Sequence, residues 1–153
     1  MPEVGLESLE LPNYIIEVGV ISGESKERKT IQFGVTNAEL MFIHENGSPL
    51  QHIPARPVLK LTLDWVKETN LIINTVVKCV GIMIATNGDL NEVDKEMNKM
   101  AIKIQNYARK IIYSNDGRLA PNAPSTIARK GDNHPLFDTG QLARSITCRA
   151  IRI

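Results

Sequence analysis

The sequence has few of the residue patterns that mark catalytic or metal sites. Its three histidines, His44, His52 and His134, lie far apart, and His44 has no second histidine at the helical spacing found in zinc proteases. No glycine-rich phosphate loop and no nucleophile elbow occur. We therefore expect a protein that is not an enzyme and that needs no metal or cofactor.

Cysteine and long apolar runs are also scarce. Cys79 and Cys148 lie far apart and in no metal-ligand spacing, so we expect two buried free thiols in a reducing compartment. The first residues lack the basic and apolar regions of a signal peptide. The longest apolar run, residues 71–85, contains Asn74 and Lys78 and is too short to span a bilayer. We expect a soluble protein made in a cytoplasm, with no membrane contact.

The chain has no strong net charge. It carries 18 basic and 17 acidic side chains, a net charge of +1, which gives no general reason to expect nucleic-acid or membrane binding. The charge is uneven, because residues 1–30 hold six glutamates against three basic residues, while residues 114–153 hold six basic residues against three aspartates. Opposite charges at the two ends could help subunits meet, although solvated surface is the commoner explanation.

The patterns that are present predict a single α+β domain over residues 1–153. Residues 14–21 are rich in β-branched side chains and predict a strand, residues 30–35 predict its hairpin partner, and residues 145–153 predict a C-terminal strand. The expected fold is a small antiparallel sheet, from this N-terminal hairpin and the C-terminal strand, packed with two or three long helices. Residues 1–13 are expected to form an extended arm.

Helical patterns fill the middle of the chain. A short helix is expected to start at a cap on Asn37 and to end at Gly47. The next helix is expected to begin at Pro57, since a proline suits the first helical position, and to break at Asn70. Residues 71–85 are ambiguous between a buried helix and a strand, and their length favours a helix.

The clearest helical pattern follows the stop signal Thr-Asn-Gly at residues 86–88. Apolar side chains, several of them methionine, recur at 3.6-residue spacing over residues 93–112, which predicts a core helix and no cofactor site. Asp89 and Glu92 form a possible capping box at its start. Residues 115–137 are rich in proline and are expected to be mostly loop.

One triplet suggests catalysis. Asp138-Thr139-Gly140 matches the Asp-Thr-Gly of aspartic proteases, in which two carboxylates share one proton across a dimer. In those enzymes the triplet lies early in a sheet domain, whereas here only 13 residues follow Gly140. A capping box for a short helix, with Asp138 at the N-cap and Gln141 at N3, explains the triplet better.

Several segments together resemble a known family. They are similar to motifs of the virion-morphogenesis and tail-completion proteins of tailed bacteriophages, with long helices between them as in that family. The matching segments are residues 43–47 (IHENG), 53–59 (IPARPVL), 123–127 (APSTI) with Lys-Gly at 130–131, and 135–146 (PLFDTGQLARSI).

The resemblance implies a structural subunit of a phage virion. Such proteins are α+β domains that form rings around the DNA channel in the neck or head–tail connector, where they complete the tail or join it to the head. The partners implied are further copies of the chain and neck, portal-adaptor, tail-tube or terminator proteins, in the virion and, during assembly, in the host cytoplasm. A tail terminator or a channel-lining gasket that touches DNA through the basic C-terminal third is the alternative.

Two loops are the expected assembly contacts. The prolines of residues 48–57 restrict the backbone before assembly, and Arg56 could reach a carboxylate or carbonyl group of a neighbouring subunit. A head-to-tail contact through residues 48–57 and 121–135 would close a ring; alternatively, the prolines only shape an internal turn. The candidate contact residues are His44, Glu45, Pro49, Pro54, Arg56, Pro57, Arg129, Lys130 and Asp138.

Overall fold

The structure is a computed structural model that describes residues 10–21 and 34–153. Most of the predicted arm and the predicted hairpin strand up to residue 33 lie outside the described residues. The elements in chain order are β1 (Tyr14–Gly19), α1 (Asn37–Asn46), the 3-10 helix η2 (Pro49–Gln51), α2 (Val58–Glu68), α3 (Leu71–Ala85), α4 (Leu90–Ser114), α5 (Pro124–Lys130), α6 (Gln141–Ser145) and β2 (Thr147–Arg152).

The described strands, β1 and β2, form a two-stranded antiparallel sheet, which confirms the α+β class and the C-terminal strand. The pairing runs from Tyr14 opposite Arg152 to Gly19 opposite Thr147. Alternate side chains of each strand face the helices, since successive residues of a strand point to opposite faces. On the other face, Arg149 Nε donates to the Glu17 carboxylate at 2.8 Å.

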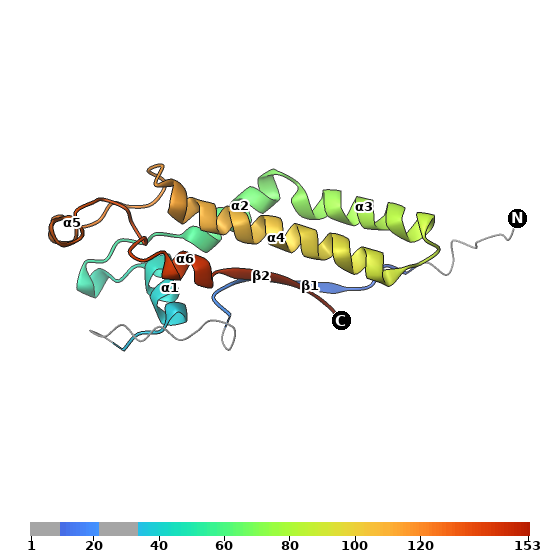
Figure 1. Cartoon of the computed structure of the whole chain (residues 1–153), viewed down its shortest axis with the longest axis horizontal. Coiled ribbons are helices and arrows are strands. Elements are labelled where there is room, and N and C mark those ends of the chain that lie inside the picture. The colour runs from blue at the N-terminus through green and yellow to red at the C-terminus, as the bar shows by residue number, and fades with distance from the viewer. Residues whose placement is uncertain (1–9, 22–33) are drawn as a thin grey trace, which may run out of the picture.

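Helix α4 is the middle of three layers, with α2 and α3 on one side and the sheet on the other (Figure 1). Its predicted apolar stripe is buried, and this confirms the expected core. The N-terminal half packs with α3 and the sheet, and the C-terminal half packs with α1, α2 and α6. Trp65 of α2 stacks on Tyr107 of α4 with 4.1 Å between ring centroids.

The helix boundaries follow the predictions with two corrections near α1 and α2. Thr36, and not Asn37, caps α1. The Thr36 hydroxyl accepts from the Glu39 backbone N–H, and the Glu39 carboxylate accepts from the Thr36 backbone N–H. Asn37 is instead buried in the first turn. Pro57 is the N-cap of α2 and lies one residue before the helix. The break at Asn70 and the helix over residues 71–85 are confirmed.

One prediction further along the chain is wrong. Asp89 caps α4 by accepting from the Asn91 N–H at 2.9 Å, but its own N–H donates to Thr86 Oγ1 and not to the Glu92 carboxylate, so the reciprocal bond of the predicted capping box does not form. Residues 115–137 are mostly loop, as predicted, and they also contain the short helix α5, which begins with a proline at its first position. A proline is suited to that place because its missing N–H has no partner there in any helix.

Both cysteines are buried free thiols, as predicted, Cys79 on α3 and Cys148 on β2. Burial raises the pKa of the Cys148 thiol to about 11. In the part of the chain that the structure describes, no single helix is long and apolar enough to cross a membrane; α2 and α3 would pass that test only together, and they are bent by 53°.

The packing of α4 predicts a large difference between two isoleucines of the same helix. Ile104 is buried in the core, whereas Ile102 is 53% exposed. Ile104→Ala is expected to lower the free energy of unfolding by about 2–5 kcal/mol, because it leaves a cavity, and Ile102→Ala by less than about 0.5 kcal/mol. Urea denaturation of the two variants measures this, and equal losses would contradict the position of α4 between the layers.

Candidate functional site

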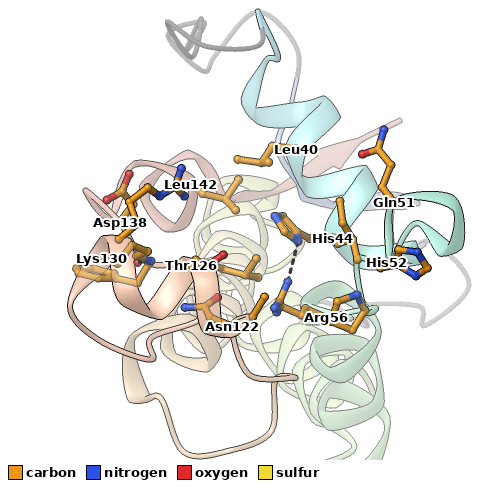
Figure 2. Close-up of a pocket in the computed structure, with 16 residues that line it drawn as sticks. Leu40, His44, Gln51, His52, Arg56, Asn122, Thr126, Lys130, Asp138 and Leu142 are labelled. Atoms are coloured by element: carbon orange, nitrogen blue, oxygen red, sulfur yellow. Dashed lines mark hydrogen bonds between the residues drawn. The ribbon is translucent and has the colours of Figure 1, made fainter.

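Most of the residues predicted to form assembly contacts surround one pocket of about 460 Å³. It lies between α1, the loop of residues 48–57, α5 and the start of α6, which come together at one end of the molecule (Figures 1 and 2). Glu45, Pro49 and Pro57 are not among its lining residues. The predicted residues that line it are His44, Pro54, Arg56, Arg129, Lys130 and Asp138.

Arg56 is buried, with only 5% of its surface exposed. Its Nε donates to the Ala120 carbonyl and its Nη2 to the Pro121 carbonyl, both at 2.7 Å. The expectation that Arg56 reaches out to a neighbouring subunit is therefore corrected, because its guanidinium is turned inward. These two charge-assisted bonds fasten the loop of residues 48–57 to the start of the second proline-rich loop.

The His44 side chain completes the contact (Figure 2). Arg56 Nη1 donates to His44 Nδ1 at 3.4 Å, and a guanidinium can only donate, so His44 Nδ1 carries no proton. Burial, with a further effect from the charge of Arg56, lowers the pKa of His44 from 6.5 to about 4. The Arg56 N–H also donates to the His44 carbonyl at 2.6 Å. His44 is thus a neutral acceptor that supports the arginine.

Glu45 and Gly47 have structural tasks within the same unit. The Glu45 carboxylate accepts from the N–H groups of Leu59 and Lys60, at 2.9 and 2.8 Å, and so caps the start of α2 from a distance. Gly47 has a φ of 73°, and a Cβ there would lie 2.8 Å from the Ala55 nitrogen. The His-Glu-Asn-Gly segment therefore builds the turn that holds the proline loop.

The outer edge of this loop is exposed. Ser48 and Ile53 form an antiparallel bridge, and the residues between them make the 3-10 turn η2 and the left-handed residue His52. Leu50, at the tip, is 95% exposed. Leu50 could not be predicted from the sequence, because a single leucine among polar residues and prolines has no periodicity that would indicate an exposed contact.

Contacts of its own hold the second loop in place. Lys130 Nζ donates to the carbonyls of His134 and Phe137. His134 Nε2 donates to the Ile112 carbonyl at 2.6 Å, and its ring stacks on Phe137 at 4.6 Å. Arg129 is exposed on the same short helix. Lys130 is therefore a structural residue in this conformation, and Arg129 is the basic side chain that faces solvent.

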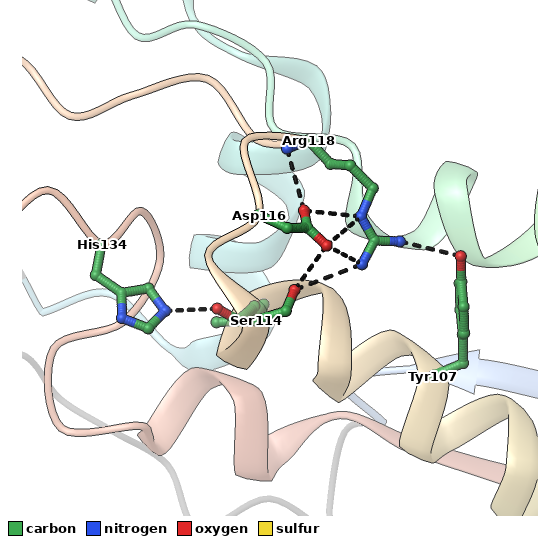
Figure 3. Close-up of polar contacts among 6 residues, drawn as sticks. Tyr107, Ser114, Asp116, Arg118 and His134 are labelled. Carbon is green, nitrogen blue, oxygen red and sulfur yellow. Dashed lines mark hydrogen bonds and ion pairs between the residues drawn. The ribbon is translucent and has the colours of Figure 1, made fainter.

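A polar cluster fixes the turn between α4 and this loop (Figure 3). Arg118 pairs with Asp116 at 2.7 Å and donates to the Tyr107 hydroxyl at 3.0 Å, and Ser114 Oγ donates to Asp116. Arg118, Ser114 and the Arg118 backbone N–H hold the pKa of the Asp116 carboxyl well below its usual range. The direction in which the chain leaves α4 is therefore set by charged hydrogen bonds.

Asp138 lies exposed at the rim of the pocket. The predicted capping box is wrong, since α6 starts at Gln141, its N-cap is Gly140, and no side chain caps it. Asp138 is the one carboxylate among the described residues that line the pocket, whereas aspartic-protease chemistry needs two. Over residues 10–21 and 34–153, no group of three or more His, Cys, Asp or Glu side chains could hold a metal ion.

The arginine contact predicts a specific loss of stability. Arg56→Ala leaves the Ala120 and Pro121 carbonyls without their donor and is expected to lower the free energy of unfolding by roughly 2 kcal/mol. Arg56→Lys is expected to recover only part of this, because an ammonium group cannot bridge both carbonyls with the same geometry. Arg129→Ala, in the same pocket but exposed, is the control and is expected to be neutral. Urea denaturation compares them, and a neutral Arg56→Ala would show that the loops are held by other contacts.

The lowered pKa of His44 predicts how stability depends on pH. As the pH falls from 6.5 to about 4, the unfolded chain binds a proton that the folded chain does not, so the free energy of unfolding decreases over this window. His44→Gln is expected to flatten the decrease, and His52→Gln, at an exposed position of the loop that follows α1, is the control. Denaturation curves at several pH values measure it; identical slopes for wild type and His44→Gln would contradict the prediction.

The geometry of this end of the molecule is thus a rigid pair of loops with an exposed edge. Most of its polar side chains hold the loops in place, and its exposed side chains include those of Leu50, Pro54, Arg129 and Asp138. No known protein family, curated protein or solved structure matches the chain.

Proposed function

We propose that the chain is a structural protein of a tailed-bacteriophage virion. It forms a ring in the neck or head–tail connector region and completes the tail or joins it to the head, without enzymatic activity. The observation that carries the proposal is that the segments resembling virion-morphogenesis and tail-completion proteins, residues 43–59 and 121–146, fold into one unit joined by Arg56.

The rigidity of this unit supports an assembly role. A ring subunit must present its contacts in a fixed geometry, and ordering a loop during association costs free energy. In this chain the free-energy cost of ordering the loop of residues 48–57 is already reduced before association. The backbone of the loop is restricted by Pro49, Pro54 and Pro57, and Arg56 fastens it to residues 120–121. The alternative, prolines that only shape an internal turn, does not account for a leucine that is 95% exposed at the tip.

The contact we propose is head-to-tail. Leu50, Pro54 and Arg129 are exposed on the outer edge of the two loops, and they meet a different surface of the next subunit, which generates a closed ring when the rotation closes. Neighbours above and below are other neck, portal-adaptor, tail-tube or terminator proteins. The protein acts in the virion, after assembly in the host cytoplasm.

A channel lining that binds DNA has less support. Three of the arginines in the basic C-terminal third pair with carboxylates: Arg118 with Asp116, Arg149 with Glu17 and Arg152 with Asp94. Paired charges release fewer counterions from a phosphate backbone.

The assembly proposal predicts that a charge at the loop tip blocks ring formation. Leu50→Asp is expected to remove an apolar contact with the next subunit and to bury an unpaired charge in that interface. Gln51→Asp, at the neighbouring exposed position, is the matched control. Neither side chain has a buried partner, so both variants are expected to keep the wild-type unfolding curve.

The measurement is light scattering and electron microscopy of the protein, alone and with the connector and tail proteins of the phage that encodes it. Rings or joined complexes are expected from wild type and Gln51→Asp and not from Leu50→Asp. A folded Leu50→Asp protein that assembles like the wild type would rule out the loop tip as the contact, and a wild type that forms no ring and joins none of these proteins would refute the proposed function.

A further inference from the structure

Helix α3 has an apolar face that nothing in the described part of the chain covers. Its inner face packs on α4 through Thr75, Cys79 and Met83. A helix that is apolar on both sides is typical of one that is buried on both sides. The exposed aliphatic residues of α3 are Ile72, Ile73, Val76, Val77, Val80 and Ile84. We call them the α3 stripe.

The α3 stripe carries no charge. Lys78 is the one charged residue of α3, and its Nζ folds down onto the Glu96 carboxylate of α4 at 2.7 Å. Helices that lie on membrane surfaces usually carry lysine and arginine along the border of the apolar face. The stripe lacks such a border on its own helix, so its chemistry fits an apolar protein surface better than a lipid surface.

The spacing within the stripe matches that of a helix–helix seam. Ile73, Val77, Val80 and Ile84 are separated by four, three and four residues, as the a and d positions of a coiled coil are. Ile73 is 62% exposed and Val77 66% exposed, so both stand out from the surface as knobs. This pattern needs a second helix with the same spacing.

A second copy of α3, running antiparallel, supplies that helix. A two-fold axis between residues 78 and 79 places Ile73 against the partner's Ile84 and Val77 against the partner's Val80. The same axis places Val76 beside the partner's Gly81, where an added Cβ would meet nothing within 4 Å in the single chain. A large side chain thus faces a small one, which is how two surfaces interdigitate at close distance.

The exposed area is sufficient for a dimer. The six side chains of the stripe together expose on the order of 500 Å², at the upper end of what a single apolar patch on a monomer reaches. Two copies would therefore bury on the order of 1,000 Å², the size at which specific interfaces begin. Contacts beside the two helices would add to this.

We propose that α3 pairs antiparallel with α3 of a second copy of this chain, about a two-fold axis near residues 78 and 79. The contact is separate from the ring contact, because α3 and the loop of residues 48–57 lie toward opposite ends of the long axis (Figure 1). The pair is a property of the chain itself and holds whether or not the chain belongs to a virion.

Cysteine cross-linking tests the pair and its direction. Residues 73 and 84 of one chain are about 16 Å apart along the helix, too far for a disulfide, which needs Cα atoms within about 7 Å. Ile73→Cys alone and Ile84→Cys alone are expected to give no cross-linked dimer under mild oxidation, whereas a mixture of the two is expected to give one. The wild type is the background control, since Cys79 and Cys148 are buried.

A second measurement covers the case in which a cysteine variant misfolds. Val77→Glu is expected to convert a dimer into a monomer in sedimentation experiments, while Asn74→Glu, exposed on the same helix outside the stripe, is expected to remain a dimer. Circular dichroism checks that both are folded. A wild type that stays monomeric at every concentration, a dimer that Val77→Glu leaves unchanged, or a cross-link from Ile73→Cys alone would overturn the proposal.

These outcomes are independent of the test at the loop tip. Leu50→Asp is expected to block rings and to leave the α3 cross-link unchanged, whereas Val77→Glu is expected to abolish the cross-link and to leave the loop tip intact. A failure of one proposal is therefore not a failure of the other.

Discussion

A buried guanidinium joins two loops that are 64 residues apart in the sequence. Two carbonyl groups and one neutral imidazole accept hydrogen bonds from the Arg56 side chain, so among the residues that the structure describes its charge is balanced by dipoles and not by a carboxylate. Such an arrangement tolerates little change, since each acceptor must stay where the planar donor group points. This contact joins the segment that holds the turn at Gly47 and the cap that Glu45 gives to α2 to the residues that lead into α5.

Helix α4 joins the remaining parts of the molecule, as Arg56 joins the two loops. It separates the sheet from α2 and α3, and it contributes buried side chains to both core clusters. Because one helix runs through both, the end that holds the loops and the end that holds α3 are parts of one body. A subunit with contacts at both ends would then hold its two neighbours at a fixed distance from each other.

Features with a strong local pattern could be predicted from the sequence. The 3.6-residue repeat of α4, the break at Asn70 and the presence of a C-terminal strand are examples. The cap of α1 lies one residue before the predicted position: Thr36 and Asn37 both suit a cap, but only Thr36 has a glutamate three residues later, Glu39, to complete a capping box. Helix α5 has only seven residues, which is too short for a periodic pattern of apolar side chains to show. The carbonyl acceptors of Arg56 lie 64 and 65 residues away in the sequence, so no local sequence pattern could predict them.

The pairing of the described strands has a consequence for synthesis. Tyr14 lies opposite Arg152, so the sheet closes a loop that contains almost the whole chain. Contacts between distant parts of a chain form late, because the entropy of closing the loop must be overcome first. While the protein is being made, α2, α3 and α4 can associate as soon as they leave the ribosome, but the face of α4 that the sheet covers stays open until residue 152 emerges. Translation therefore delays the closing of the sheet, and a pause before that point would leave this face open to chaperones.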